Sequence, residues 1–153
     1  MQDRVFTSLT FEEWSRVLYA KCTGTVNLHE ATLHLPLDFF IMTTSISNHV
    51  GHMTQVAYSA ANNFQDAFAQ YRNRLGLPAC ASALGLVTEI SDSGNATSSP
   101  QAMTRINLYG TGEHDFLRII EAAYLSDPPS TNLITCLEPC RILDTERASS
   151  QGA

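Results

Sequence analysis

A lysine, a serine and a tyrosine in the first 60 residues have side chains that could together reduce a carbonyl group. Tyr58 could give a proton to the carbonyl oxygen, while Ser45 could hold that oxygen by a hydrogen bond. Lys21 would supply a nearby positive charge that eases loss of the tyrosine proton, and it could hold the ribose of a cofactor. The hydride would have to come from a nicotinamide, because no side chain can supply one.

The alternation of helical and strand patterns predicts an α/β fold with a parallel sheet. Thr10 and Glu13 form a capping-box pattern, which begins a long helix, bent near Gly24, that ends before Pro36. Trp14, Val17, Leu18, Cys22, Val26, Leu28, Ala31 and Leu33 are its expected inward positions. Buried strands are predicted at 37–43, 79–87 and 132–136. Two amphipathic helices separate these strands, one with an inward stripe from Ala57 to Tyr71 and one at 113–125.

Ligand sites in parallel sheets lie beyond the carboxyl ends of the strands, where Ser45 and the segment 85–87 are predicted to fall. Tyr58 and Asn62 are four residues apart on the helix after Ser45, so they project on one side of that helix. Lys21 lies on the preceding helix, which is expected to pack beside the same sheet. The predicted elements therefore direct all four side chains to one region.

Each of these residues also has an ordinary structural explanation. Tyr58 could be a surface residue at a helix start, Ser45 a helix cap and Lys21 a solvated charge. Composition and periodicity alone favour these explanations over a catalytic site.

The segment from Thr44 to Ala69 (TSISNHVGHMTQVAYSAANNFQDAFA) resembles the signature of polyketide-synthase ketoreductase domains in the short-chain dehydrogenase/reductase superfamily. Most short-chain reductases place the lysine four residues after the tyrosine. Megasynthase ketoreductases have asparagine there and the lysine on the previous helix, as with Asn62 and Lys21. The sequences of residues 3–6 and 110–124 are most similar to those of fungal highly reducing synthases. The matching positions are Ser45, Gly51, Gln55, Tyr58, Ala60, Asn62, Phe64, Asp66, Ala67, Arg72 and 76–79, with Lys21, Gly24 and 37–40 upstream.

The resemblance implies NADPH-dependent reduction of a β-ketoacyl thioester, carried on an acyl carrier protein, to the β-hydroxyacyl thioester. Tyr58 would be the proton donor and Ser45 the carbonyl holder. Lys21 and Asn62 would support the ribose and a proton-relay water. Gly85 and Val87 would line the nicotinamide pocket.

The resemblance covers residues 1–140 and implies the C-terminal half of a Rossmann-like ketoreductase, without the N-terminal dinucleotide-binding half. Residues 141–153 look like a disordered tail. The glycine pair Gly110 and Gly112 lacks a third glycine at the required position, Asp115, so it is no phosphate loop. Half of such a sheet would leave a strand edge open, which predicts weak stability or association.

Two other interpretations stay open. The chain could be a non-catalytic remnant or interaction module that binds no cofactor. It could also be a separately encoded half that joins an N-terminal ketoreductase half.

Composition excludes several classes of protein. The net charge is −6, and the chain lacks the excess of basic residues that is typical of proteins that bind nucleic acid. No apolar run is long enough to cross a membrane and no signal peptide is present, so we expect a cytoplasmic protein. The five histidines lack metal-binding spacing, and free thiols are expected for the four cysteines.

Overall fold

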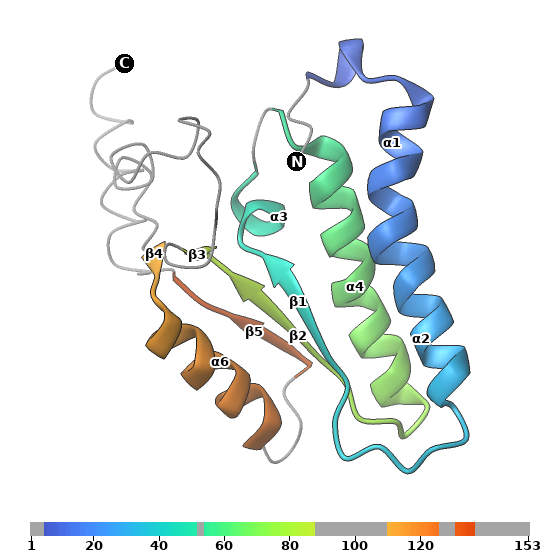
Figure 1. The fold of residues 1–153 in the computed structure, drawn as a ribbon, viewed down its shortest axis with the longest axis vertical. Coiled ribbons are helices and arrows are strands. Elements are labelled where there is room, and N and C mark those ends of the chain that lie inside the picture. Colours follow the sequence, from blue (N-terminus) through green and yellow to red (C-terminus); the bar gives the residue numbers. More distant parts are fainter. Residues whose placement is uncertain (1–4, 52–53, 88–109, 126–130, 137–153) are drawn as a thin grey trace.

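Helices flank a small parallel sheet in the computed structural model, which describes residues 5–51, 54–87, 110–125 and 131–136 (Figure 1). The helical segments are η1 (Phe6–Ser8), α1 (Phe11–Leu18), the π-helical turn η2 (Tyr19–Thr23), α2 (Gly24–Thr32), α3 (Ser47–Val50), α4 (Val56–Arg74) and α6 (Glu113–Leu125). The strands are β1 (Ile41–Ser45), β2 (Cys80–Leu84), β3 (Leu86–Val87), β4 (Gly110–Thr111) and β5 (Asn132–Ile134).

The main sheet has the strand order β1-β2-β5, and both pairings are parallel. This confirms the predicted α/β fold and its three strand regions. The boundaries of the first strand differ from the prediction, because pairing with β2 begins only where Phe40 accepts a hydrogen bond from Cys80 (3.0 Å). Strand β1 ends on Ser45, two residues beyond the predicted end, so Ser45 lies at the carboxyl end of the strand as expected.

The predicted continuous strand at 79–87 was wrong. Strand β2 ends at Leu84, which pairs with Ser45 of β1. The chain after Ser45 turns into α3, and the last hydrogen bond between the two strands runs from the Ile46 N–H to the Leu84 carbonyl (2.8 Å). After Gly85 the chain forms β3, which pairs with β4 in a separate two-stranded sheet.

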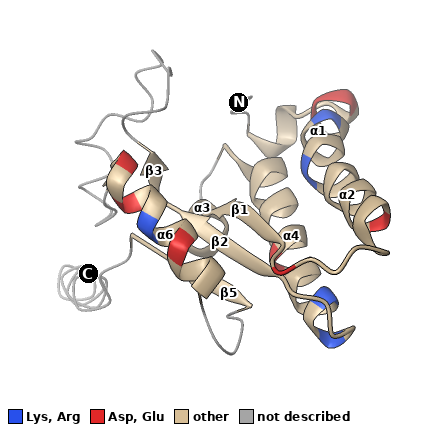
Figure 2. Ribbon diagram, turned by 60° about the horizontal axis from the view of Figure 1, so that its bottom comes forward, with Lys and Arg blue, Asp and Glu red and all other residues tan. Residues whose placement is uncertain are grey.

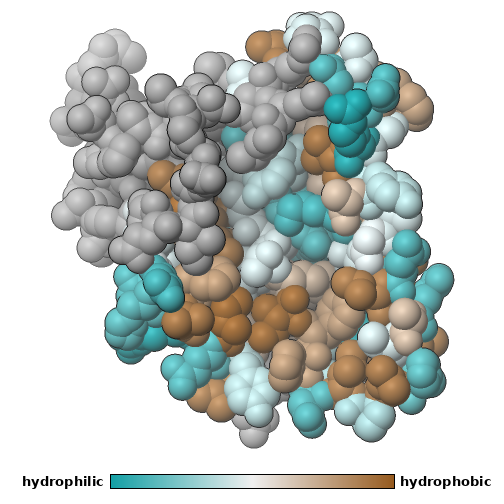
Figure 3. Space-filling model, in the orientation of Figure 1, coloured by the Kyte–Doolittle hydropathy of each residue, from teal (hydrophilic) through white to brown (hydrophobic). Residues whose placement is uncertain are grey.

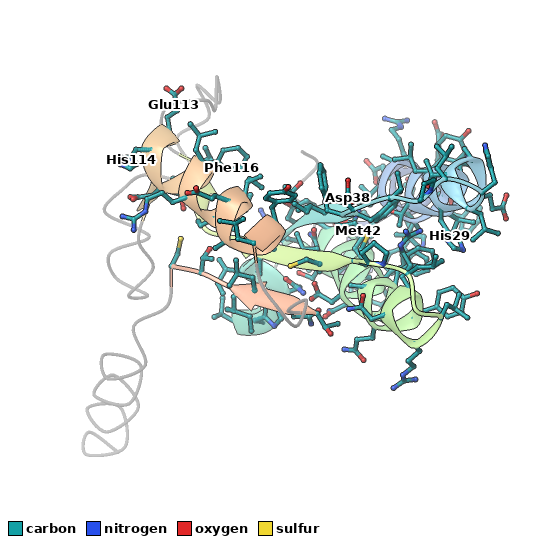
Figure 4. All side chains as sticks on the ribbon, turned by 90° about the horizontal axis from the view of Figure 1, so that it is seen from below. His29, Asp38, Met42, Glu113, His114 and Phe116 are labelled. Atoms are coloured by element: carbon teal, nitrogen blue, oxygen red, sulfur yellow. The ribbon has the colours of Figure 1, made fainter. Side chains whose placement is uncertain are left out.

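Helices cover both faces of the main sheet. Neighbouring residues on a strand point to opposite faces. Met42 packs in a core with Phe68 and Ala69 of α4, whereas Ile41 lines a groove with α6. The view from below shows the same three layers, with α6 on one side of the strands and α4 on the other (Figure 4). Helix α6 matches its prediction, since Phe116, Ile119, Ile120 and Ala123 are its less exposed positions.

The first long helix begins at the predicted capping box. The Thr10 hydroxyl accepts from the Glu13 N–H (3.2 Å), and Glu13 Oε2 accepts from the Thr10 N–H (3.0 Å). The helix runs beside α4 and contains one π-helical turn, η2, just before Gly24 (Figure 1). It ends at Thr32, before Pro36.

The expected inward positions of α2 were partly wrong. Leu28 is 61% exposed and Leu33 is 54% exposed, while Thr25 and His29 are buried. The reason is that α2 faces polar side chains of α4, which a pattern of apolar residues does not reveal. Ala31 is also exposed.

Helix α4 buries polar residues alongside its apolar stripe. Ala57, Ala61 and Phe68 are buried as predicted, whereas Ala67 and Tyr71 are exposed. Four buried polar side chains share the inner side of this helix: Asn62, Gln65, Asp66 and Arg72.

Charged residues lie mostly on the helices, and the strands of the main sheet are free of them (Figure 2). Within the described ranges no helix is long and apolar enough to span a bilayer, and no cluster of three or more His, Cys, Asp or Glu side chains could hold a metal ion. Asp3 and Arg4 of the family-like segment 3–6 and the predicted tail 141–153 lie outside the described residues.

The Arg72 side chain of α4 contacts α2 and the segment that precedes β2. Its side chain is 2% exposed and lies over the Phe40 ring, 4.0 Å from the centroid. One terminal nitrogen donates to His29 Nδ1 (2.7 Å), and Nε donates to the Pro78 carbonyl (3.3 Å). Arg72 therefore joins α2, α4 and the segment that precedes β2.

We predict that Arg72→Ala lowers the free energy of unfolding by about 3 kcal/mol, since it removes two charge-assisted hydrogen bonds and leaves a cavity. Urea denaturation followed by circular dichroism would measure this loss. Arg74→Ala in the same turn is the control, because Arg74 is exposed and its removal should change stability by less than about 0.5 kcal/mol. Equal effects of the two changes would contradict the role of Arg72.

Candidate active site

Lys21 lies in the π-helical turn η2 and reaches two other elements. Its ammonium donates to the Thr43 carbonyl of β1 (2.9 Å) and to Gln65 Oε1 of α4 (3.0 Å). The same nitrogen lies 5.8 Å from the centroid of the Tyr58 ring. A π-helical turn inserts one extra residue into a helix and is frequent at functional sites. The structure thus brings together two of the residues singled out in the sequence.

Asn62 is fully buried one helical turn after Tyr58. Its Nδ2 donates to the Tyr58 carbonyl (2.8 Å), while its Oδ1 is buried and accepts no hydrogen bond from the described residues. A buried amide oxygen without a donor is costly, so a water or ligand donor would stabilise it.

Ser45 lies at the carboxyl end of β1, on the edge of the sheet where α4 begins. Its Oγ accepts from the hydroxyl (3.0 Å) and the N–H (3.3 Å) of Ser47, the first residue of α3. Ser59 of α4 also contacts α3, through the Ser47 carbonyl (3.5 Å). Ser45 is therefore joined to α4 through α3 rather than by a direct contact with Tyr58.

Gly85 and Val87 follow β2 at the same end of the sheet. The register pairs Ser45 with Leu84, which places Gly85 next to the end of β1. Both residues are half-buried. They lie at the edge where ligands of parallel sheets bind.

The Asp66 carboxylate of α4 contacts two residues of α3. Its Oδ2 accepts from Asn48 Nδ2 (2.6 Å) and lies 3.4 Å from His49 Nε2. Asp66 is 6% exposed, and its other oxygen accepts no hydrogen bond from the described residues. The carboxylate thus holds α3, the short helix that follows Ser45, against α4.

Burial lowers the pKa of Lys21 from its ordinary value of 10.5. The negative charge of Asp66 opposes this effect and raises the pKa, as does Cys22. Lys21 in turn lowers the pKa of the Cys22 thiol, although burial of that thiol has the larger, raising effect. A charge near the lysine therefore helps to keep the ammonium protonated.

The arrangement fits a nicotinamide cofactor at the Lys21–Tyr58 cluster. An ammonium has three donors, and Thr43 and Gln65 occupy two of those of Lys21. The third donor, the Tyr58 hydroxyl and the buried Asn62 oxygen are suited to a ribose, a carbonyl and a water.

A groove on the opposite face of the sheet is separate from this cluster. It lies between β1 and α6, where Figure 3 shows hydrophobic side chains gathered. The rings of Phe39 and Tyr124 meet there edge to face at 5.2 Å. The lining residues are Phe39, Ile41, His114, Leu117, Arg118, Ile120, Glu121 and Tyr124.

Sequence reasoning missed Gln65 and Thr25 and gave Asp66 no role. A signal was present for two of them, because Gln65 and Asp66 follow Tyr58 at seven and eight residues and so share its helix face. Thr25 carried no such signal, since its contact with Gln65 joins two separate helices.

The comparisons with known proteins agree on one family. Residues 1–89 match the family described as "KR domain". The chain is 39% identical to prosolanapyrone synthase of Alternaria solani over 95% of its length, and 37% identical to highly reducing polyketide synthase xilA of Penicillium rubens over 99%. It spans only 6% and 7% of those proteins.

Solved structures give the same result. An A-type ketoreductase from a modular polyketide synthase has a TM-score of 0.78 and 27% identity, and the match covers 88% of this chain and 28% of that one. A ketoreductase domain from the bacillaene assembly line has a TM-score of 0.82 over 94% of this chain and 36% of its own. At 24% identity, that second likeness concerns the fold alone.

We predict that the stability difference between wild type and Lys21→Met depends on pH. Because the folded protein lowers the pKa of Lys21, the charged form costs stability below that pKa, and the cost disappears as the pH rises to 10.5. The stability of Lys21→Met relative to wild type should therefore be highest near neutral pH and fall toward pH 10.5. Urea denaturation across this range measures the difference.

Arg16→Met is the matched control, since Arg16 is an exposed cation on α1. Its stability relative to wild type should not vary over the same pH range. A flat difference for Lys21→Met would show that burial does not perturb the lysine.

Proposed function

The chain belongs to the ketoreductase (KR) domain family of polyketide synthases, and we propose that it carries the catalytic side chains for NADPH-dependent reduction of a β-ketoacyl thioester. Members of this family are oxidoreductases of the short-chain dehydrogenase/reductase type, which bind a nicotinamide dinucleotide and act in polyketide biosynthesis. The observation that supports the proposal best is the approach of Lys21 to Tyr58 beside the carboxyl end of β1.

Four side chains take the roles that the family resemblance implies. The Tyr58 hydroxyl gives its proton to the substrate carbonyl oxygen, and the Ser45 hydroxyl holds that oxygen by a hydrogen bond. Lys21 places a positive charge near the tyrosine, which favours loss of its proton, and donates to the cofactor ribose. Asn62 holds a water through its buried oxygen, and this water returns a proton to the site.

The cofactor, when bound, supplies the hydride. Gly85 and Val87 line the pocket of its nicotinamide ring. The product is the β-hydroxyacyl thioester, and the substrate is carried on an acyl carrier protein of the same synthase. The reaction takes place in the cytoplasm.

The chain works as one part of a larger ketoreductase. Two observations support this: it covers 28% of the solved A-type ketoreductase, and β1 pairs on one side only within the described sheet. The rest of the domain would add a strand to this edge of β1 and cover the groove that contains Phe39 and Tyr124. Its backbone amides would hold the cofactor diphosphate, as helix N-termini do in dinucleotide-binding folds.

We predict that the chain alone binds NADPH only at millimolar concentrations, because the diphosphate would lack its amide donors. Fusion to the remaining ketoreductase residues of a fungal relative should restore tight binding, followed by NADPH fluorescence. The fusion should then reduce a β-ketoacyl thioester. Tight binding and turnover by the chain alone would contradict the need for a larger domain.

Tyr58→Phe in the active fusion should lower kcat by about 10²–10⁴-fold, since the proton donor is lost. Tyr71→Phe on the exposed side of the same helix is the control and should leave kcat unchanged. Full activity of Tyr58→Phe would overturn the proposed role, and NADPH binding without any turnover would favour a non-catalytic module.

A further inference from the structure

The buried Gln65 side chain of α4 contacts both Lys21 of η2 and Thr25 of α2. Its Oε1 accepts from the Lys21 ammonium (3.0 Å), and its Nε2 donates to Thr25 Oγ1 (3.0 Å). Gln65 is 8% exposed and Thr25 is 5% exposed. The three residues thus form a chain of hydrogen bonds from α2 through α4 to η2.

The chemistry of the two ends fixes which way the amide points. An ammonium only donates, so it can bind only the amide oxygen, whereas a hydroxyl can accept from the amide nitrogen. If the amide were rotated by 180°, its NH₂ group would face the ammonium and both would be donors. The ammonium therefore selects the orientation of the amide, and the Thr25 hydroxyl, which can accept or donate, anchors the amide nitrogen in that orientation.

We propose that Gln65 is a positioning residue: Thr25 anchors its amide nitrogen, and the amide oxygen holds the Lys21 ammonium between α4 and β1. The role of this ammonium toward a cofactor rests on the proposed function, but its placement does not. With Thr43 and Gln65 as acceptors, the third donor of the ammonium has a fixed direction, and no search among lysine rotamers precedes ligand binding.

Charged and titratable groups approach Lys21 from α4 and from η2. Asp66 and Tyr58 lie on α4, and Cys22 lies on η2 beside the lysine. Strand β1 contributes no titratable side chain and offers only the Thr43 carbonyl. A change at Gln65 that leaves these groups intact therefore reports on the amide itself.

The sequence offers a direct measurement, because Lys21 is the only lysine among its 153 residues. Labelling with ¹⁵N-lysine gives a single side-chain NMR signal, whose pH titration yields the pKa of this group in the full chain without cofactor. Gln65→Leu should lower the pKa of Lys21 below that of wild type, because it removes an acceptor that stabilises the charged form. Gln65→Glu should raise it.

Two further variants separate positioning from packing. Thr25→Val, with Gln65 intact, should also lower the pKa of Lys21, by less than Gln65→Leu does, whereas Thr25→Ser should match wild type. The double variant Thr25→Val with Gln65→Leu removes the hydroxyl that loses its amide partner in Gln65→Leu, so its stability should recover relative to Gln65→Leu alone. Its lysine pKa should nevertheless remain low.

Gln70→Leu is the matched control on the exposed side of α4 and should leave the titration unchanged. The proposal is overturned if Gln65→Leu titrates like wild type, or if the double variant regains the wild-type pKa together with its stability. Neither result depends on cofactor binding or turnover, so failure of this proposal is distinguishable from failure of the proposed function.

Discussion

The placement of one ammonium group constrains the part of the molecule that carries the site. Lys21 extends from η2 and donates to a backbone carbonyl of β1 and to a side chain of α4. A half-buried cation that lost either acceptor would carry a desolvation cost, so these three elements are held in their relative positions. Since β1 ends at Ser45 and α4 begins near Tyr58, fixing the elements also fixes the distance between the residues at their ends.

The buried side of α4 applies the same constraint along its whole length. The amide nitrogen of Asn62, one carboxylate oxygen of Asp66 and the guanidinium of Arg72 each have a hydrogen-bonding partner at a specific place in the structure. An apolar helix could slide or rotate by a small angle at little cost, because hydrophobic contacts are non-directional. Directional bonds to His29, Asn48 and Pro78 prevent this and hold the helix in one orientation.

Much of the architecture could be predicted from local sequence patterns. The capping box at Thr10 and the helix at 113–125 depend on residues close together in the chain, and both predictions were confirmed. The split between β2 and β3 was not predictable, because it depends on where a neighbouring strand stops. The inward positions Leu28 and Leu33 were wrong for a related reason: which side of α2 is buried depends on the polar side chains of α4.

In the candidate site, too, features within one element could be predicted from the sequence, whereas contacts between elements could not. Lys21, Tyr58 and Asn62 were found through a family motif, and the structure brings them together. Lys21 is held by Gln65 and by the carbonyl of Thr43, 44 and 22 residues away in sequence. Gln65 in turn contacts Thr25, 40 residues away. No pattern within one helix could have predicted a hydrogen bond that joins two helices.

The π-helical turn at Tyr19–Thr23 makes the site sensitive to chain length. One residue more than an α-helical turn requires is accommodated there, and an α-helix turns by about 100° for each residue. Deletion of a single residue in this turn would restore regular α-helix and leave α1 and α2 close to their present orientation, because the wider turn absorbs the extra residue. The residues within the turn would nevertheless move, and the Lys21 side chain would point away from Thr43 and Gln65. Evolution of this segment is therefore expected to tolerate substitutions at its exposed positions far better than a change of one residue in its length.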